Sequence, residues 1–211
     1  MSKKKAEINA KKFVKSYWNY YIELEQQLWE TRRYVDFSKK NNRTFSIEYL
    51  KLLQAICSEI DVIAKVIATY VDPMFKGNTI NHWGYALQKI FPDIQKSTVV
   101  FNDDYDVQPW KNWCYVSVEH EKDGKKNVTI KLADKAKNPQ WWTSYNKSKH
   151  ERTSKYNDCS TNYERANLKH VIEALSALYI IEKLFSEYIF KREDVVIEMN
   201  ESKLFSDITF G

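Results

Sequence analysis

The sequence predicts an all-α fold, a bundle of four main helices with a small β-hairpin insertion. Apolar residues recur at steps of three and four along several long stretches, which is the spacing of an amphipathic helix. Only 4 glycines and 4 prolines interrupt the 211 residues, and this scarcity favours long helices over many turns. We expect a single domain over residues 1–211, with the β insertion at about 97–132 and a C-terminal tail at about 193–211.

Two long helices are expected first. Residues 13–35 place apolar side chains on one face and charged ones on the other. Ser46 is positioned to cap the second helix, which runs to about Val71, where Asp72 and Pro73 stop it. Helices joined by a short loop pack antiparallel. Glu59, close to the apolar stripe of the second helix, is expected to face inward and pair with a lysine or arginine of the helix predicted over Trp141–Tyr156.

The middle of the chain combines a third helix with short strands. The helix is expected from Thr79 to Phe91, with Pro92 as its stop. Strands are predicted at 98–101, 113–118 and 127–132, which are short and rich in β-branched and aromatic residues. The last two flank Asp123-Gly124, a hairpin turn signal.

Two further helices close the bundle. Asn138 as N-cap and Pro139 at the first helical position predict a helix over Trp141–Tyr156, called the motif helix below. Thr161 and Glu164 form a capping box that opens the final long helix, which ends near Lys191-Arg192. In the tail beyond it, residues 195–197 have the composition of a short strand.

The motif helix carries the candidate site, because it gathers amide, imidazole, ammonium and guanidinium groups. Asn146 and His150 are four residues apart and share one face, while Tyr145, Lys149 and Arg152 line an adjoining stripe. The positive bias suits an anionic ligand. The expected catalytic residues are His150, Asn146 and Arg152, and the expected substrate-binding residues are Lys149, Lys147 and Tyr145.

Composition limits the other possibilities. The net charge of +5 permits a nucleic-acid partner without requiring one. Cys57, Cys114 and Cys159 are widely spaced and form no CxxC pair, so neither a disulfide framework, a metal site nor a cofactor is predicted. His82, His120 and His170 are expected to have structural roles, because no spacing joins them to a metal or catalytic set.

The chain is expected to work in the cytoplasm without a membrane span. Its basic N-terminus lacks the apolar core of a secretory signal. No stretch reaches about 18 uninterrupted apolar residues, the length that a membrane-spanning helix needs.

These elements together resemble the HEPN superfamily. The resemblance rests on the two long N-terminal helices, on the Trp-Trp-x-x-Tyr-Asn-x-x-Lys-His-x-Arg pattern that begins at Trp141, and on the capped helix containing Ala166-Asn167-Leu168. It spans roughly Tyr17 to Tyr188. Members of this superfamily are compact helical bundles, usually dimeric, found in bacterial toxin and phage-defence systems, including AbiV-like abortive-infection proteins.

The resemblance implies a metal-independent ribonuclease motif. In active members an arginine, commonly followed by a polar residue, precedes a histidine by four to six residues. On the motif helix His150 matches the histidine and Asn146 the polar residue. The candidate arginine positions are occupied by Tyr145, Ser144 and Thr143, so the arginine is absent. Arg152 and Lys149 are then the nearest cations that could hold a phosphate.

Three functional hypotheses follow. The first is an RNA-targeting toxin or effector in phage defence, in which His150 moves the proton and a homodimer supplies a second histidine. A phage protein or an antitoxin would be its protein partner. The second is a non-catalytic module that binds a protein or a nucleotide through the same basic face. The third, a purely structural oligomerisation unit, gives the polar cluster no purpose.

Overall fold

The computed structural model describes residues 8–122, 125–155, 157 and 160–211, with side chains omitted at 120–127. The α-helices are α1 (Ala10–Phe13), α2 (Asn19–Thr31), α3 (Ile47–Val71), α4 (Ile80–Ile90), α5 (Gln140–His150) and α6 (Leu168–Glu193). The strands are β1 (Ser97–Phe101), β2 (Tyr105–Val107), β3 (Tyr115–Lys122), β4 (Lys125–Leu132) and β5 (Phe205–Phe210). A π-helix, η1 (Val14–Trp18), joins α1 to α2, and 3-10 turns form η2 (Lys39–Asn41), η3 (Ile94–Lys96) and η4 (Asn162–Arg165).

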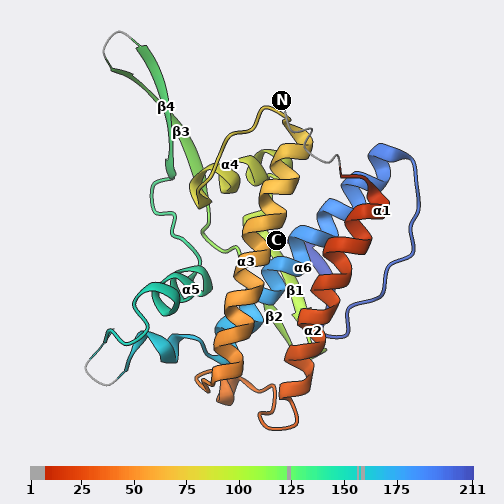
Figure 1. Cartoon of the computed structure of the whole chain (residues 1–211), viewed down its shortest axis with the longest axis vertical. Helices are drawn as coiled ribbons and strands as arrows, with labels where there is room; N and C mark the ends of the chain where they lie inside the picture. The colour runs from red at the N-terminus through yellow and green to blue at the C-terminus, as the bar shows by residue number, and fades with distance from the viewer. Residues whose placement is uncertain (1–7, 123–124, 156, 158–159) are drawn as a thin grey trace, which may run out of the picture.

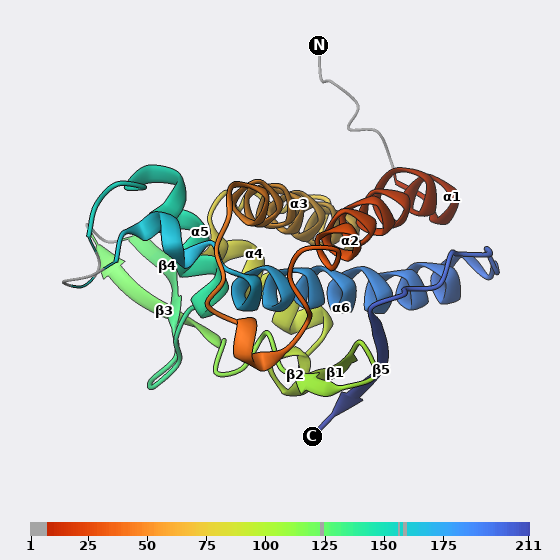
Figure 2. The same cartoon turned by 90° about the horizontal axis from the view of Figure 1, so that it is seen from below.

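Helix α6 is the central element of the fold. Helices α2 and α3 pack on one side of it, and the sheet that contains β1 and β5 lies on the other side (Figures 1 and 2). The apolar residues whose spacing predicts the helices also form this core. Fully buried side chains at the α3–α6 contact include Ile56, Ile60, Ile63 and Ile67 of α3 and Val171, Leu175, Leu178 and Ile181 of α6.

The prediction of an all-α bundle is wrong, because the described chain forms two antiparallel sheets as well as its helices. One sheet has the strand order β2-β1-β5, and the other is the β3–β4 hairpin. In β1 the side chains of Ser97, Val99 and Phe101 are buried, and the residues between them are partly exposed. This alternation lets the sheet cover α6 as a second layer, so the strands are part of the core and not an insertion beside it.

The C-terminal strand was missed because a distant buried carboxylate determines its position. Glu25 of α2 is 2% exposed and accepts hydrogen bonds from the Tyr21 hydroxyl at 2.5 Å, from the Lys203 amide at 2.7 Å and from the Ser202 hydroxyl. The tail therefore folds back along the bundle, and Phe205–Phe210 pairs with β1. Residues 195–197, where a strand was predicted, form no strand.

The predicted hairpin is present as β3 and β4, which pair from Tyr115 with Leu132 to Lys122 with Lys125. Its expected turn, Asp123-Gly124, lies outside the described residues. The hairpin projects from the body of the molecule (Figure 1). Buried Trp113 and Tyr115 fix its base against α4, where a Cβ at Gly84 would come within 2.6 Å of both rings.

Helix boundaries follow the capping signals closely. Ser46 caps α3 as predicted, its hydroxyl accepting the Tyr49 amide at 3.1 Å. The capping box of Thr161 and Glu164 is also present, but it opens η4 and not the final long helix as predicted, because Asn167 is the N-cap of α6. The first predicted helix, residues 13–35, is found instead as a helical run from Ala10 to Thr31 that contains the π-helix η1.

One buried carboxyl group has no hydrogen-bond partner. Glu182 in the middle of α6 is 0% exposed, and neither of its carboxylate oxygens makes a hydrogen bond. Burial, and then the charge of Glu59, raise the pKa of Glu182 well above its ordinary value. Glu59 thus influences Glu182, and the expected pairing of Glu59 with a cation of the motif helix does not appear among the described ion pairs. Glu182 therefore keeps its proton to higher pH in the folded protein than an exposed glutamate does.

We expect Glu182→Gln to make stability less dependent on pH. An unfolded glutamate ionises near 4.5, while the folded Glu182 keeps its proton to higher pH. The native state then binds more protons, so stability falls with rising pH by about 1.4 kcal/mol per pH unit between the two pKa values. Glutamine removes that slope. Urea unfolding from about pH 5 to about pH 8 measures it, with exposed Glu30→Gln as the control. Equal slopes for Glu182→Gln and the wild type would contradict the assignment.

Candidate functional site

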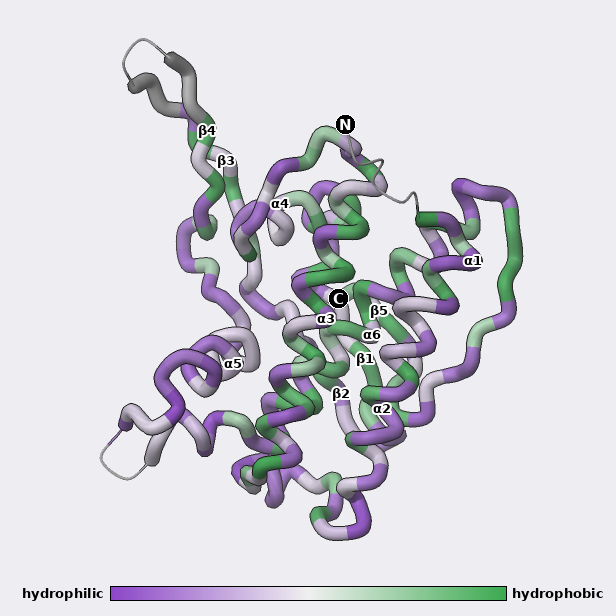
Figure 3. The backbone as a smooth tube through the Cα atoms, viewed as in Figure 1, coloured by the Kyte–Doolittle hydropathy of each residue, from purple (hydrophilic) through white to green (hydrophobic). Residues whose placement is uncertain are grey.

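The motif helix is the shorter helix α5, which begins at Gln140 and ends at His150. Pro139 occupies the N-cap position, one residue later than predicted for Asn138. The side chain of Asn138 instead accepts a hydrogen bond from the Tyr115 hydroxyl at 2.9 Å. The hydrophilic colouring of α5 in Figure 3 agrees with its polar sequence. Even so, Trp141 and Trp142 are buried and pack in the core, as expected.

The predicted substrate-binding residues of α5 are engaged with their own helix. Tyr145 is only 7% exposed, and its hydroxyl accepts a hydrogen bond from the Lys149 ammonium at 3.0 Å. Lys147 pairs with Glu151 at 2.8 Å. Cations in the last turn of a helix also complement its dipole. Stabilisation of the helix end is therefore sufficient to explain these lysines.

The predicted catalytic residues of α5 are not joined to one another. The Asn146 amide donates to the Trp142 carbonyl at 3.1 Å, and Nε of Arg152 points back to the Ser148 carbonyl at 3.4 Å. His150 is exposed, and its imidazole makes no hydrogen bond to another residue in the described part of the chain. Asn146 therefore does not orient His150, and the structure assembles no catalytic set from these three residues.

A second arginine and histidine have the spacing that the resemblance requires. Arg165 lies before His170 in the chain, with four residues between them. The sequence interpretation that gave His170 a structural role overlooked this pair, although the spacing could be read directly from the chain. Arg165 is the last residue of η4, and His170 lies in the first turn of α6. The fold thus places the pair at the junction between the two elements.

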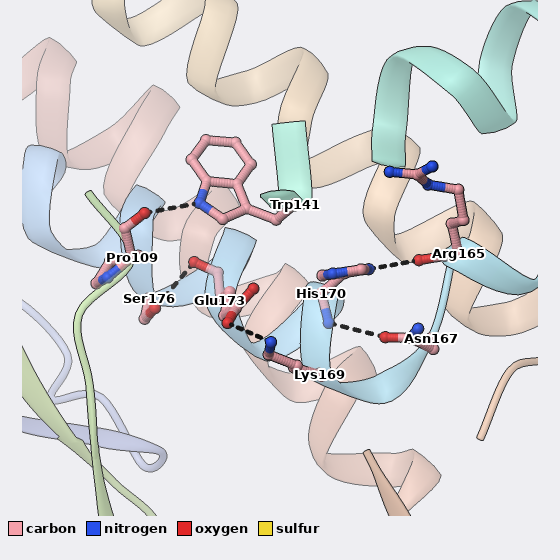
Figure 4. Close-up of polar contacts among 8 residues, drawn as sticks. All are labelled: Pro109, Trp141, Arg165, Asn167, Lys169, His170, Glu173 and Ser176. Atoms are coloured by element: carbon pink, nitrogen blue, oxygen red, sulfur yellow. Dashed lines mark hydrogen bonds and ion pairs between the residues drawn. The ribbon is translucent and has the colours of Figure 1, made fainter. Parts of the chain in front are cut away.

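A short hydrogen bond orients the imidazole of His170 (Figure 4). Nδ1 lies 2.7 Å from the backbone carbonyl oxygen of Arg165. Because a carbonyl can only accept, Nδ1 carries the proton and Nε2 keeps its lone pair. Burial, and then the charges of Lys169 and Arg165, lower the pKa of His170 to about 4. His170 is only partly buried. Because its pKa is about 4, the imidazole is neutral at physiological pH, and the hydrogen bond at Nδ1 fixes its tautomer.

Hydrogen bonds from outside α6 fix its first turn. The amides of Leu168 and Lys169 donate to the carbonyls of Thr44 and Asn42 at 2.9 and 3.2 Å. The side chain of Asn167 accepts the amide of His170 at 3.1 Å. These bonds satisfy the amides that have no acceptor within the helix. Three hydrogen bonds therefore hold the backbone of the turn that carries His170.

Helix α5 supports the same site from the side. Nε of Arg165 donates to the hydroxyl of Ser144, which is fully buried in α5, at 3.4 Å. Trp141 of α5 donates through Nε1 to the Pro109 carbonyl at 3.0 Å (Figure 4). The motif helix thus contributes to the site by positioning Arg165, and its exposed face is not needed for that role.

The described residues contain no group of three or more histidine, cysteine or acidic side chains that could hold a metal ion. Nor does any described helix combine the length and apolar character needed to cross a membrane. The chain matches no protein-family model, no curated protein and no solved structure at the level that marks a relative. The function of the site is therefore inferred from its own chemistry.

Proposed function

We propose that this protein is an RNA-targeting effector of phage defence, with a metal-independent ribonuclease site built on His170 and Arg165. The observation that supports this proposal best is the neutral imidazole of His170, held in one tautomer 2.7 Å from the Arg165 carbonyl. Such a ring has an unprotonated nitrogen ready to accept a proton. The spacing of the pair also agrees with the motif that the HEPN resemblance implies.

The proposed reaction uses a ribose hydroxyl as the nucleophile. Nε2 of His170 accepts the proton of the 2′-hydroxyl, and the 2′-oxygen forms a bond to phosphorus. The bond between phosphorus and the 5′-oxygen breaks, and the 5′-oxygen takes a proton from water. The resulting hydroxide takes the proton that His170 holds, which restores the neutral imidazole. The products are a 2′,3′-cyclic phosphate and a 5′-hydroxyl. A phosphodiester bound beside the ring adds negative charge, which raises the pKa of His170 from about 4 and makes it a stronger base.

Arg165 is proposed to stabilise the charge on the phosphate. Its guanidinium has a planar set of donors that suits phosphate oxygens. The bond from Nε to Ser144 sets the direction of the group. Together the two residues supply a base and a cation within five positions of one another, whereas His150 has no arginine before it at the motif spacing.

A homodimer is part of this proposal. Next to the site, Phe45 and Ile47 are 43% and 62% exposed. Phe45 forms a β-bridge with Asn167, the N-cap of α6, and its ring packs edge-on against Tyr163 at 5.5 Å. A contiguous exposed apolar patch marks an interaction surface, and we propose that these two side chains form part of one. A second copy docked here would place two histidine sites near each other.

We further propose that the protein acts on RNA in the cytoplasm and that a phage protein or an antitoxin regulates it by binding.

Substitutions at His170 and His150 test which of the two histidines is the catalytic base. His170→Asn keeps a donor for the Arg165 carbonyl but removes the basic nitrogen, so RNA cleavage should fall by about 100-fold or more. His150→Ala, the matched control on α5, should cleave at the wild-type rate. Cleavage of synthetic RNA by the purified proteins measures both, with thermal unfolding as the check on folding.

Arg165→Gln should also lower cleavage, by about 100-fold, because the donor to the phosphate is lost. A folded His170→Asn protein with full cleavage would refute the proposed site. A wild-type protein that binds RNA without cleaving it would favour the non-catalytic binding module instead.

The second prediction concerns the dimer. Ile47→Glu places a charge in the proposed apolar interface, so it should convert the protein to a monomer and abolish growth arrest. Light scattering at micromolar concentration measures the mass. Val128→Glu, which changes an equally exposed valine on the hairpin, is the control and should remain dimeric. A wild-type monomer would remove the dimer from the proposal while leaving the His170 test intact.

A further inference from the structure

A small pocket lies beside the proposed site, on the same end of α6. It has a volume of about 200 Å³ and is formed by three segments that are distant in sequence. These are η2 with the residues after it, strand β2, and the first turns of α6, which lie together in Figure 2. Lys169 and Glu173 of its wall are one residue before and three residues after His170. The pocket therefore opens within about one helical turn of the histidine.

Two ammonium groups from different segments line this pocket. Lys39 comes from η2, and its Nζ lies 4.6 Å from the centre of the Tyr105 ring. Lys169 comes from α6, and its Nζ is 3.6 Å from the Glu173 carboxylate, which is long for an ion pair. Among the described residues neither lysine makes an ion pair shorter than 3.6 Å. The two charges can therefore be shared with an anion such as a phosphate group.

The rest of the wall suits a flat ligand with polar edges. Val107 and Ile172 give it an apolar side. The Glu173 carboxyl is largely buried, and burial raises its pKa. The Nε2 group of Gln108 donates to the Gln95 carbonyl at 3.2 Å, which fixes the amide and leaves Oε1 as an acceptor for another donor. The volume is below that of sites for drug-sized molecules, so it suits one nucleobase and not a longer segment.

We infer that this pocket binds a single nucleotide of an RNA strand, with Lys39 and Lys169 on the phosphate and Glu173 and Gln108 on the edge of the base. The choice of RNA rests on the proposed function, whereas the pocket and its charges do not. A nucleotide held here places the adjoining phosphodiester near His170. The pocket thereby selects which position in the strand is cleaved.

Binding is tested without cleavage by titrating a 2′-O-methylated RNA trinucleotide, which lacks the nucleophilic hydroxyl, into the protein by calorimetry. The four nucleoside monophosphates and inorganic phosphate are titrated in parallel. The trinucleotide and at least one monophosphate should bind saturably and more tightly than inorganic phosphate. Lys39→Gln and Lys169→Gln should each weaken binding by about tenfold, because each removes one charged contact.

Two controls make the result decisive. Lys51→Gln changes an exposed lysine near the start of α3 that pairs with Glu48 and does not line the pocket, and it should bind as the wild type does. His170→Asn should keep trinucleotide binding. Trinucleotide binding without any wild-type cleavage would support the pocket and refute the ribonuclease. No saturable binding, equal binding by both lysine variants and the wild type, or phosphate binding as tight as that of the trinucleotide would overturn the pocket assignment.

Discussion

The fixed first turn of α6 is the constraint on which the arrangement of this protein depends. A helix begins with amides that have no acceptor of their own, and here Thr44, Asn42 and Asn167 supply the acceptors. These bonds tie the connection between α2 and α3 to the central helix. They also bring η2 beside Lys169, which creates the pocket, and hold the backbone of His170 where its ring meets the Arg165 carbonyl. Helix capping and the geometry of the candidate site are therefore consequences of the same hydrogen bonds.

Two buried glutamates show how differently the same group can contribute to one bundle. Glu25 is surrounded by donors, and through them it holds the C-terminal segment so that β5 can complete the sheet over α6. Glu182 has no donor among the described residues, and burial raises its pKa well above its ordinary value. A satisfied carboxylate fixes the tail, whereas the unsatisfied one makes the stability of the α3–α6 contact depend on pH. Glu25 therefore joins the tail to the bundle through hydrogen bonds, whereas Glu182 contributes no hydrogen bond to the contact between α3 and α6 within the described residues.

Local signals predicted much of the helical structure, and contacts between distant segments account for most of what they missed. Ser46 and the Thr161 box act within three or four residues, so their positions are legible in the sequence. Strand β5 depends on Glu25, far away in the chain, and no local pattern reveals that dependence. Likewise, the polar cluster of α5 could be located, but not that Tyr145 would be buried and Asn146 bonded to its own helix. The spacing of Arg165 and His170, in contrast, is a local feature that the sequence alone shows.

The protonation of His170 tests the central claim most directly, because a catalytic base must be neutral with Nε2 unprotonated. Long-range hydrogen–nitrogen correlation NMR on protein labelled with nitrogen-15 histidine gives the tautomer and the titration of each ring. We expect the proton of His170 on Nδ1 throughout the neutral range, with a pKa of about 4 that rises when a 2′-O-methylated RNA is added. A proton on Nε2, or a free-protein pKa near about 6.5 as in an unstructured peptide, would contradict the assignment of His170 as the base.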